Sequence, residues 1–262
     1  MSEDSVWGVR ETVRSSDGVS IGMVTAGQGP PLLLVHGGMR TAADWAPLWP
    51  LLVERYRVTA MDRRGRGMSG DAPDYPSGQE YDDVAAVARH LGRVDVLAHS
   101  IGAVFALGAA SRGAPIRRLV LCEPPGPPTL GREWLDRASA RIAAGEAGRA
   151  LVEFLVEING LDPATVTAMR DSPVAANAVE IFAATFRREG ELLIALDLAD
   201  LARGVTAPVH FLLGEHSPAW AAAVTRALAA MLAGSGVTVV EGQGHDMVDS
   251  APEIVVAELG LR

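Results

Sequence analysis

The stretch VDVLAHSIGAVFALGAAS, residues 94–111, decides the fold expected of this chain. Its first part, residues 94–98, predicts a strand that runs into Ser100. Its second part, residues 101–111, is rich in Ala and Gly and predicts a helix. Ser100 falls on the turn between the two, at the N-terminus of that helix. Backbone N–H groups and the helix dipole favour developing negative charge there.

The residues around Ser100 suit a nucleophile on a sharp turn. Such a turn favours small residues two positions before and after the serine, and Ala98 and Gly102 occupy these positions. Glycine is the usual residue at both places, so Ala98 is a mild departure. A serine before a helix is more commonly an N-cap. The rest of the chain therefore has to decide between a cap and a nucleophile.

The segments on both sides of this stretch alternate between strands and helices. An Asp17-Gly18 turn joins the first two strands in a hairpin. Strands are expected at residues 9–13, 19–25, 32–35, 58–61, 94–98, 116–121, 209–213 and 237–240, and helices at 41–55, 81–91, 101–111, 218–232 and 252–259, with a break at Pro50. This order predicts an α/β fold, with a mainly parallel central sheet of about eight strands and helices on both faces.

Residues 125–204 interrupt this alternation. They carry helical patterns at 134–143, 147–158 and 174–188 and no strand pattern. We therefore expect a helical lid (cap) inserted after the sixth strand, over the carboxyl edge where open α/β sheets bind ligands. Residues 1–124 and 205–262 would then form the core.

Composition excludes several classes of function. The net charge of -9 and the absence of a basic patch argue against a nucleic-acid partner. One cysteine excludes an internal disulfide framework, and the six histidines lack metal-ligand spacing, so neither a metal nor a cofactor is expected. The N-terminus lacks the order of a signal peptide and no stretch resembles a membrane span, which predicts a cytoplasmic protein with no membrane partner. A homodimer is left open.

Two further motifs stand at the ends of expected strands. His36-Gly37-Gly38 follows the third strand, and the stretch GQGH at 242–245 follows the last one. With the turn at Ser100, they make the chain resemble the α/β-hydrolase family over nearly its whole length. The resemblance implies that Gly38 and Ile101 donate backbone N–H groups to an oxyanion hole. It also implies that His245 takes the proton of Ser100 and later delivers it to the leaving group.

The loop after the fourth strand carries a fourth stretch that matches the family. It consists of Asp62, Arg64, Gly65, Gly67 and Ser69, at a spacing that many relatives share. We expect a structural role for these residues, in a tight loop with a buried ion pair.

The acid of the expected triad is where the chain departs from the family. Most relatives carry Gly-x-x-Asp after the seventh strand, but here serine stands in the place of the aspartate, at Ser217. Some members, including certain haloalkane dehalogenases and zearalenone-lactone hydrolases, carry the acid after the sixth strand. Glu123 stands there, beside two prolines that stiffen the backbone. We expect Glu123 to be the acid, with Glu215 and Asp246 as the alternatives.

A serine nucleophile implies an acyl-enzyme, as in esterases and lactonases. In this family, haloalkane dehalogenases and epoxide hydrolases use aspartate at the same place. The expected reaction is hydrolysis of an ester or lactone of a small apolar molecule. Alternatives are a cofactor-independent lyase, cyclase or oxygenase on the same fold, and a hydrolase-like receptor of small molecules. The residues expected to line the substrate pocket are Met39, Trp45, Trp134, Phe154, Phe182 and Phe186.

Overall fold

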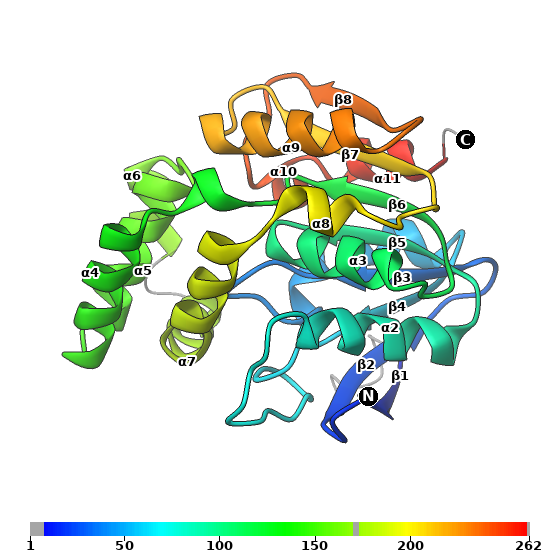
Figure 1. The fold of residues 1–262 in the computed structure, drawn as a ribbon, viewed down its shortest axis with the longest axis horizontal. Coiled ribbons are helices and arrows are strands. Elements are labelled where there is room, and N and C mark those ends of the chain that lie inside the picture. The colour runs from blue at the N-terminus through cyan, green and yellow to red at the C-terminus, as the bar shows by residue number, and fades with distance from the viewer. Residues whose placement is uncertain (1–7, 170–172, 261–262) are drawn as a thin grey trace.

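A central eight-stranded sheet organises the chain in a computed structural model that describes residues 8–169 and 173–260 (Figure 1). The strands are β1 (Val9–Arg14), β2 (Ser20–Ala26), β3 (Pro31–Val35), β4 (Arg57–Met61), β5 (Val94–His99), β6 (Ile116–Cys122), β7 (Val209–Gly214) and β8 (Gly236–Val240). Their order in the sheet is β1-β2-β4-β3-β5-β6-β7-β8. β1 and β2 pair antiparallel, as do β2 and β4, and all other neighbours are parallel. The predicted fold class is confirmed.

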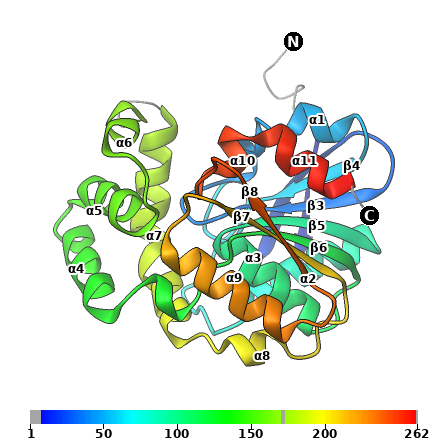
Figure 2. The ribbon, with the colours of Figure 1, turned by 90° about the horizontal axis from the view of Figure 1, so that it is seen from above.

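Helices cover both faces of this sheet, and two apolar clusters lie between them and the strands (Figure 2). One face carries α2 (Gln79–Leu91), α3 (Ile101–Ser111) and α9 (Ala219–Met231). The other carries η2 (Ala42–Trp45), α1 (Trp49–Val53), α10 (Met247–Ser250) and α11 (Pro252–Gly260). The strands β3 and β5 are almost fully buried, which explains the unbroken apolar sequence of β3; in β5 the buried Asp95 and His99 interrupt the apolar residues.

The expectation of a helix over residues 41–55 with a break at Pro50 is wrong, because the interruption comes earlier. The segment forms the short 3₁₀ helix η2 and the five-residue helix α1, and the chain turns between them. Pro47 lies in that turn, where its missing N–H and fixed φ interrupt a helix. Pro50 lies instead in the first turn of α1, a place that tolerates proline.

Helix α3 is buried along its length because small residues let its neighbours approach closely. A Cβ at Gly108 would lie 2.5 Å from the ring of Tyr81 on α2. A Cβ at Gly102 would collide with the backbone carbonyl of His36 at the end of β3. Glycine at position 102 therefore lets the start of α3 pack directly against the end of β3, and glycine at position 108 lets α3 pack against α2.

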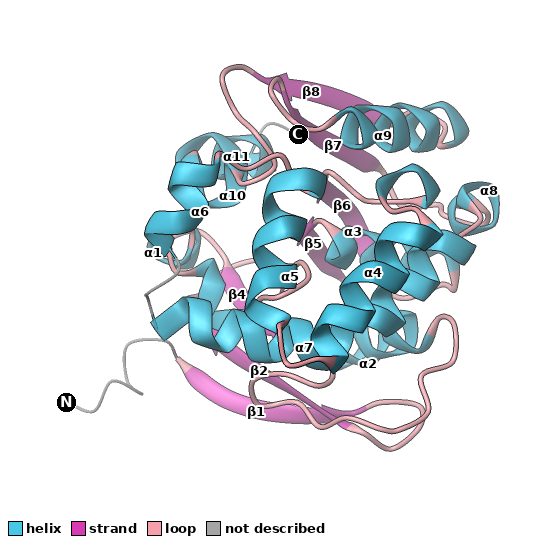
Figure 3. Cartoon of the chain, turned by 90° about the vertical axis from the view of Figure 1, so that its left-hand side faces the viewer, coloured by secondary structure: helices cyan, strands magenta, loops and turns pink. Residues whose placement is uncertain are grey.

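Residues 125–204, which we call the helical insert, connect β6 to β7. They contain η3 (Pro127–Thr129), α4 (Arg132–Ala143), α5 (Ala147–Glu153), η4 (Phe154–Ile158), α6 (Pro163–Met169), α7 (Pro173–Ala195) and α8 (Leu198–Ala202). Figure 3 shows α4, α5 and α7 in front of the strands. An apolar cluster that includes Leu135, Leu151 and Phe182 joins these helices. Across the described residues, no helix is long and apolar enough to cross a membrane.

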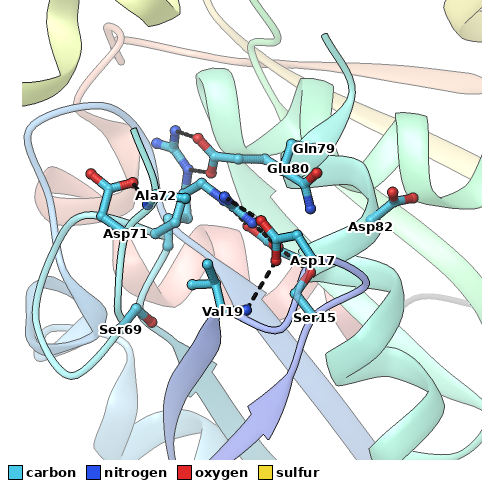
Figure 4. A network of polar contacts seen from close by, with 12 residues as sticks. Ser15, Asp17, Val19, Ser69, Asp71, Ala72, Gln79, Glu80 and Asp82 are labelled. Carbon is cyan, nitrogen blue, oxygen red and sulfur yellow. Dashed lines mark hydrogen bonds and ion pairs between the residues drawn. The ribbon is translucent and has the colours of Figure 1, made fainter. Parts of the chain in front are cut away.

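A network of polar side chains ties the β1–β2 hairpin to the loop after β4 and to α2. The Arg64 guanidinium donates to Asp83 through Nε (2.6 Å) and Nη2 (2.7 Å), and to Asp17 through Nη1 (3.0 Å). Figure 4 shows Ser15 and Asp17 of the hairpin together with Gln79, Glu80 and Asp82 of α2. The loop after β4 thus carries a buried ion pair between Arg64 and Asp83.

Asp62 of the same loop has backbone partners. Its carboxylate accepts the backbone N–H groups of Ala42 (2.7 Å) and Met68 (2.8 Å). It thus holds the loop after β4 against the segment that follows β3.

Candidate active site

Ser100 stands on a strained turn between β5 and α3. Its φ of 54° lies in the left-handed region, which side chains other than that of glycine rarely adopt. Its backbone N–H donates to the carbonyl of Cys122 on the neighbouring strand (2.8 Å), which helps to hold this conformation. The Ser100 hydroxyl makes no capping bond to α3. The hydroxyl is therefore free to act as a nucleophile, the other role that the sequence suggested for Ser100.

His245 faces the Ser100 hydroxyl from the loop after β8. Its Nε2 lies 3.2 Å from Ser100 Oγ, and its Nδ1 lies 2.6 Å from Glu123 Oε2. Because a carboxylate only accepts, Nδ1 carries the proton and Nε2 is left to accept from Ser100. The structure thus brings together Ser100, His245 and Glu123, the three residues expected to form a triad.

Neighbouring rings hold His245 in place. The edge of Trp220 approaches its ring, with centroids 5.1 Å apart, and the ring of His99 lies 4.9 Å away. His99 Nε2 donates to the backbone carbonyl of His245 (2.9 Å). Burial lowers the pKa of His99 well below its usual value, and the neighbouring His245 adds to this effect. A neutral His99 donor therefore supports the loop that carries His245.

Glu123 follows β6 directly and reaches across to the end of β7. It is fully buried and has a φ of 50°, a second left-handed residue other than glycine. Its Oε1 accepts the backbone N–H of Gly214 (2.7 Å) and the hydroxyl of Ser217. Its Oε2 is left for His245. The carboxylate is thus held by three donors, and each comes from a different residue of the β7 and β8 ends.

Ser217 and Gly214 were not singled out as site residues from the sequence. Ser217 stands where most relatives carry the acid, and its hydroxyl contacts the carboxylate that has moved to β6. The one sequence signal for this contact was a serine at the position where most relatives carry the aspartate of Gly-x-x-Asp. Glu215 points elsewhere, since its Oε2 accepts the backbone N–H of Gly242 (2.9 Å). Neither Glu215 nor Asp246 has a side-chain bond to His245 among the described residues.

A cavity opens at Ser100 between the core and the insert. Gly38 and Ile101 line it on the core side, beside the serine. Ile101 is the first residue of α3, so its N–H has no partner within the helix. The other lining residues are Met39, Ser100, Pro125, Thr129, Leu130, Phe154, Asn159, Phe182, Thr185, Phe186, Glu189, Gly190, Leu193 and Trp220.

Four of the six residues expected in the pocket line this cavity: Met39, Phe154, Phe182 and Phe186. The expectation is wrong for Trp45, which is buried in the apolar cluster under η2 and α1, on the other face of the sheet. It is also wrong for Trp134, which lies behind the cavity wall. Its ring packs edge-on against Phe154 and Phe186, and its Nε1 donates to Glu157 (2.8 Å).

Glu189 is the acidic member of the cavity wall that sequence patterns did not reveal. It lies on α7, yet its Oε1 accepts from Arg63 (2.6 Å) and Arg66 (2.7 Å), which follow β4. Burial opposes ionisation of Glu189, but the two guanidinium groups outweigh it and lower its pKa to about 2. The residues involved are more than 120 positions apart, so no local pattern pairs them. No group of His, Cys, Asp and Glu in the described part of the chain is arranged to hold a metal ion.

Comparisons with known proteins give a matching family model and several similar chains. A family model described as the alpha/beta hydrolase family matches residues 32–258. The 2-(acetamidomethylene)succinate hydrolase of Mesorhizobium japonicum is 29% identical over 255 residues, which is 91% of each chain. The N-formylmaleamate deformylase of Pseudomonas putida is 39% identical over 104 residues, 38% of this chain and 39% of that one. The crystal structure of an alpha/beta hydrolase from Sphaerobacter thermophilus has a TM-score of 0.81 at 32% identity and covers 95% of this chain and 100% of its own.

Proposed function

The chain belongs to the alpha/beta hydrolase family and is an enzyme of the hydrolase class, and we propose that it cleaves a carboxylic ester or lactone of a small, mainly apolar molecule. The observation that carries the proposal is the line of contacts from Ser100 Oγ through His245 to Glu123. The aromatic and aliphatic wall of the cavity at Ser100 supports an apolar substrate.

Acylation begins with proton transfer. His245 Nε2 accepts the proton of Ser100 as Oγ attacks the carbonyl carbon of the substrate. The carbonyl oxygen becomes an oxyanion, and we expect the N–H groups of Gly38 and Ile101 to donate hydrogen bonds to it. When the tetrahedral intermediate collapses, the bond to the leaving oxygen breaks. His245 gives its proton to that oxygen, and an acyl-Ser100 ester remains.

Deacylation repeats these steps with water. His245 takes a proton from a water molecule, whose oxygen attacks the acyl carbon, and the Ser100–acyl bond breaks as Oγ regains the proton. Glu123 holds the tautomer of His245 with the proton on Nδ1 and stabilises the imidazolium that forms in both halves. Ser217 acts as a positioning residue, because its hydroxyl orients the carboxylate of Glu123.

We next consider which type of bond the enzyme cleaves and in which kind of substrate. The two curated relatives are named for an acetamidomethylene and an N-formyl compound, and both names describe acids. In this chain the cavity presents Glu189, whose negative charge opposes a substrate carboxylate beside it. Beside Glu189, an uncharged group of an ester or lactone therefore fits better than a carboxylate does.

The test combines active-site labelling with turnover. Wild type is incubated with a fluorophosphonate probe and then with a panel of p-nitrophenyl esters, simple lactones and matched anilides. We expect labelling of Ser100, loss of labelling in Ser100→Ala, and faster turnover of esters or lactones than of anilides. Binding of the panel without turnover or labelling would instead identify a receptor. Preference for anilides would overturn the ester and lactone assignment.

A further inference from the structure

A second cavity at Ser100 and His245 includes Arg40, Asp44, Asp246 and Asp249. The cavity that Glu189 lines holds one ionised group in a wall that is otherwise apolar or neutral. Among the described residues that line it, Glu189 is the one with a charged side chain. Its side chain is 9% exposed, so it is not a surface acid that happens to lie at a rim. A carboxylate in such a place has to be stabilised by partners or by a ligand.

The two oxygens of this carboxylate have different surroundings. Oε1 accepts from both Arg63 and Arg66. Oε2 has no hydrogen-bond partner among the described residues. It lies beside Gly38, because a Cβ built on that glycine would meet Oε2 at 3.8 Å and no other atom within 4 Å. An acceptor oxygen therefore faces open space next to an expected donor of the oxyanion hole.

The charges around Glu189 are already balanced. Arg63 also pairs with Glu80, at 2.6 Å and 2.8 Å, so that two guanidinium groups meet two carboxylates. A cation bound at Oε2 would leave this buried cluster with a net positive charge, and an anion would be repelled by the carboxylate. A neutral donor, such as a hydroxyl or an amide N–H, satisfies the oxygen without changing the charge.

We propose that Glu189 is a specificity residue, which selects substrates that carry a neutral hydroxyl or N–H group able to reach Oε2 beside Gly38. The inference rests on the proposed function, since it names the class of substrate that the same cavity accepts. The substrate is then an apolar ester or lactone with one hydrogen-bond donor near its scissile carbonyl. A substrate with a carboxylate at the same place is disfavoured.

The test on wild type uses a matched series of p-nitrophenyl esters. The series consists of phenylacetate and its ring-hydroxylated, ring-methoxylated and ring-carboxylated derivatives at each ring position. We expect kcat/KM for the best hydroxylated ester to exceed that of phenylacetate by about 10- to 100-fold, which is the worth of a hydrogen bond to a charged group. The methoxylated and carboxylated esters at the same position should fall below phenylacetate.

A variant tests whether Glu189 is the cause. In Glu189→Gln the amide oxygen can stay with the two arginines, which turns the NH₂ group toward the cavity. The preference for hydroxyl over methoxyl should then drop to within about threefold. The matched control is Glu191→Gln, two residues along α7, where the carboxylate is 39% exposed and pairs with Arg132. This control should keep the wild-type preference.

The outcomes separate the two proposals. Absence of both labelling and ester turnover in wild type would overturn the proposed function. Labelling and turnover without a preference for any hydroxylated ester, or with a preference for the carboxylated one, would overturn the role of Glu189 alone. If Glu189→Gln fails to fold, the wild-type series still decides between these results. An unchanged preference for the hydroxylated ester in a folded Glu189→Gln variant would also overturn the role of Glu189.

Discussion

The two walls of the cavity are built in different ways. The core wall is held by backbone and polar contacts, with left-handed residues at Ser100 and Glu123 and short bonds between side chains at the ends of four strands. Apart from Glu189, the insert wall consists mainly of aromatic and aliphatic side chains on helices, such as Phe182 and Phe186, whose ring centroids lie 4.3 Å apart. The first kind of wall tolerates almost no displacement, whereas the second can repack with modest changes in affinity. The proposed chemistry therefore depends on the core and the choice of substrate largely on the insert.

The largest effect is expected where the core wall loses its acid. In Glu123→Gln the amide can force the wrong tautomer on His245, so kcat should fall by about 10⁴-fold. The matched control is Glu215→Gln, which should change kcat by less than about twofold because Glu215 bonds to Gly242 rather than to His245. Steady-state kinetics on the best ester measures both. A normal rate for the first variant and a collapse for the second would reverse our assignment of the acid.

A smaller loss should follow from removing the hydroxyl that orients this acid. Ser217→Ala deletes a hydrogen bond to a buried carboxylate, worth about 1.5–3 kcal/mol, so kcat should fall by about 10- to 100-fold with little change in KM. Ser217→Thr keeps the hydroxyl and should recover most of the rate. Equal losses in the two variants would mean that packing, and not the hydroxyl, sets the effect.

The core wall should also make the fold sensitive to mild acid. Burial lowers the pKa of His36 and of His99 well below 6.5, so both stay neutral in the folded state. The unfolded chain binds these protons below about pH 6.5, and stability therefore falls as the pH drops, by up to about 1.4 kcal/mol per pH unit for each histidine. Urea unfolding between pH 7.5 and 5 measures this slope, and His99→Gln should reduce it by up to half. The insert contains no histidine, so it does not contribute to this slope through a histidine. If His99→Gln keeps the full slope, His99 is not a source of the pH dependence.

The smallest effect is expected in the insert wall. Phe182→Leu replaces one ring of the aromatic cluster by a smaller aliphatic side chain and leaves the contacts of Ser100 intact. KM for an apolar ester should rise by about threefold, with kcat within about twofold of wild type. A fall in kcat comparable to that of Ser217→Ala would show that the insert also positions the reacting groups, and the contrast between the walls would fail.

The parts of the site that could be predicted are those that depend on neighbours in sequence. The strand–turn–helix around Ser100 and the loop of His245 follow strands with clear apolar patterns, so their places in the sheet could be inferred. Trp45 shows the limit, because an apolar pattern does not say which face of the sheet a residue joins. The cluster of Glu189 with Arg63 and Arg66 joins α7 to the loop after β4. No periodic pattern in the sequence predicts a contact between residues so far apart, so the cluster could be found only from the structure.

The contact between Glu123 and Ser217 has a consequence for how this family can diverge. The two side chains touch, and Ser217 stands where most relatives carry the acid, so we infer that a carboxylate at either position can serve the same imidazole. An ancestor could gain Asp at 217 while Glu123 was still present, with the two acids sharing one proton, and lose Glu123 later. At no step of that path would the histidine be without an acid. Migration of the acid between neighbouring strands thus requires no inactive intermediate.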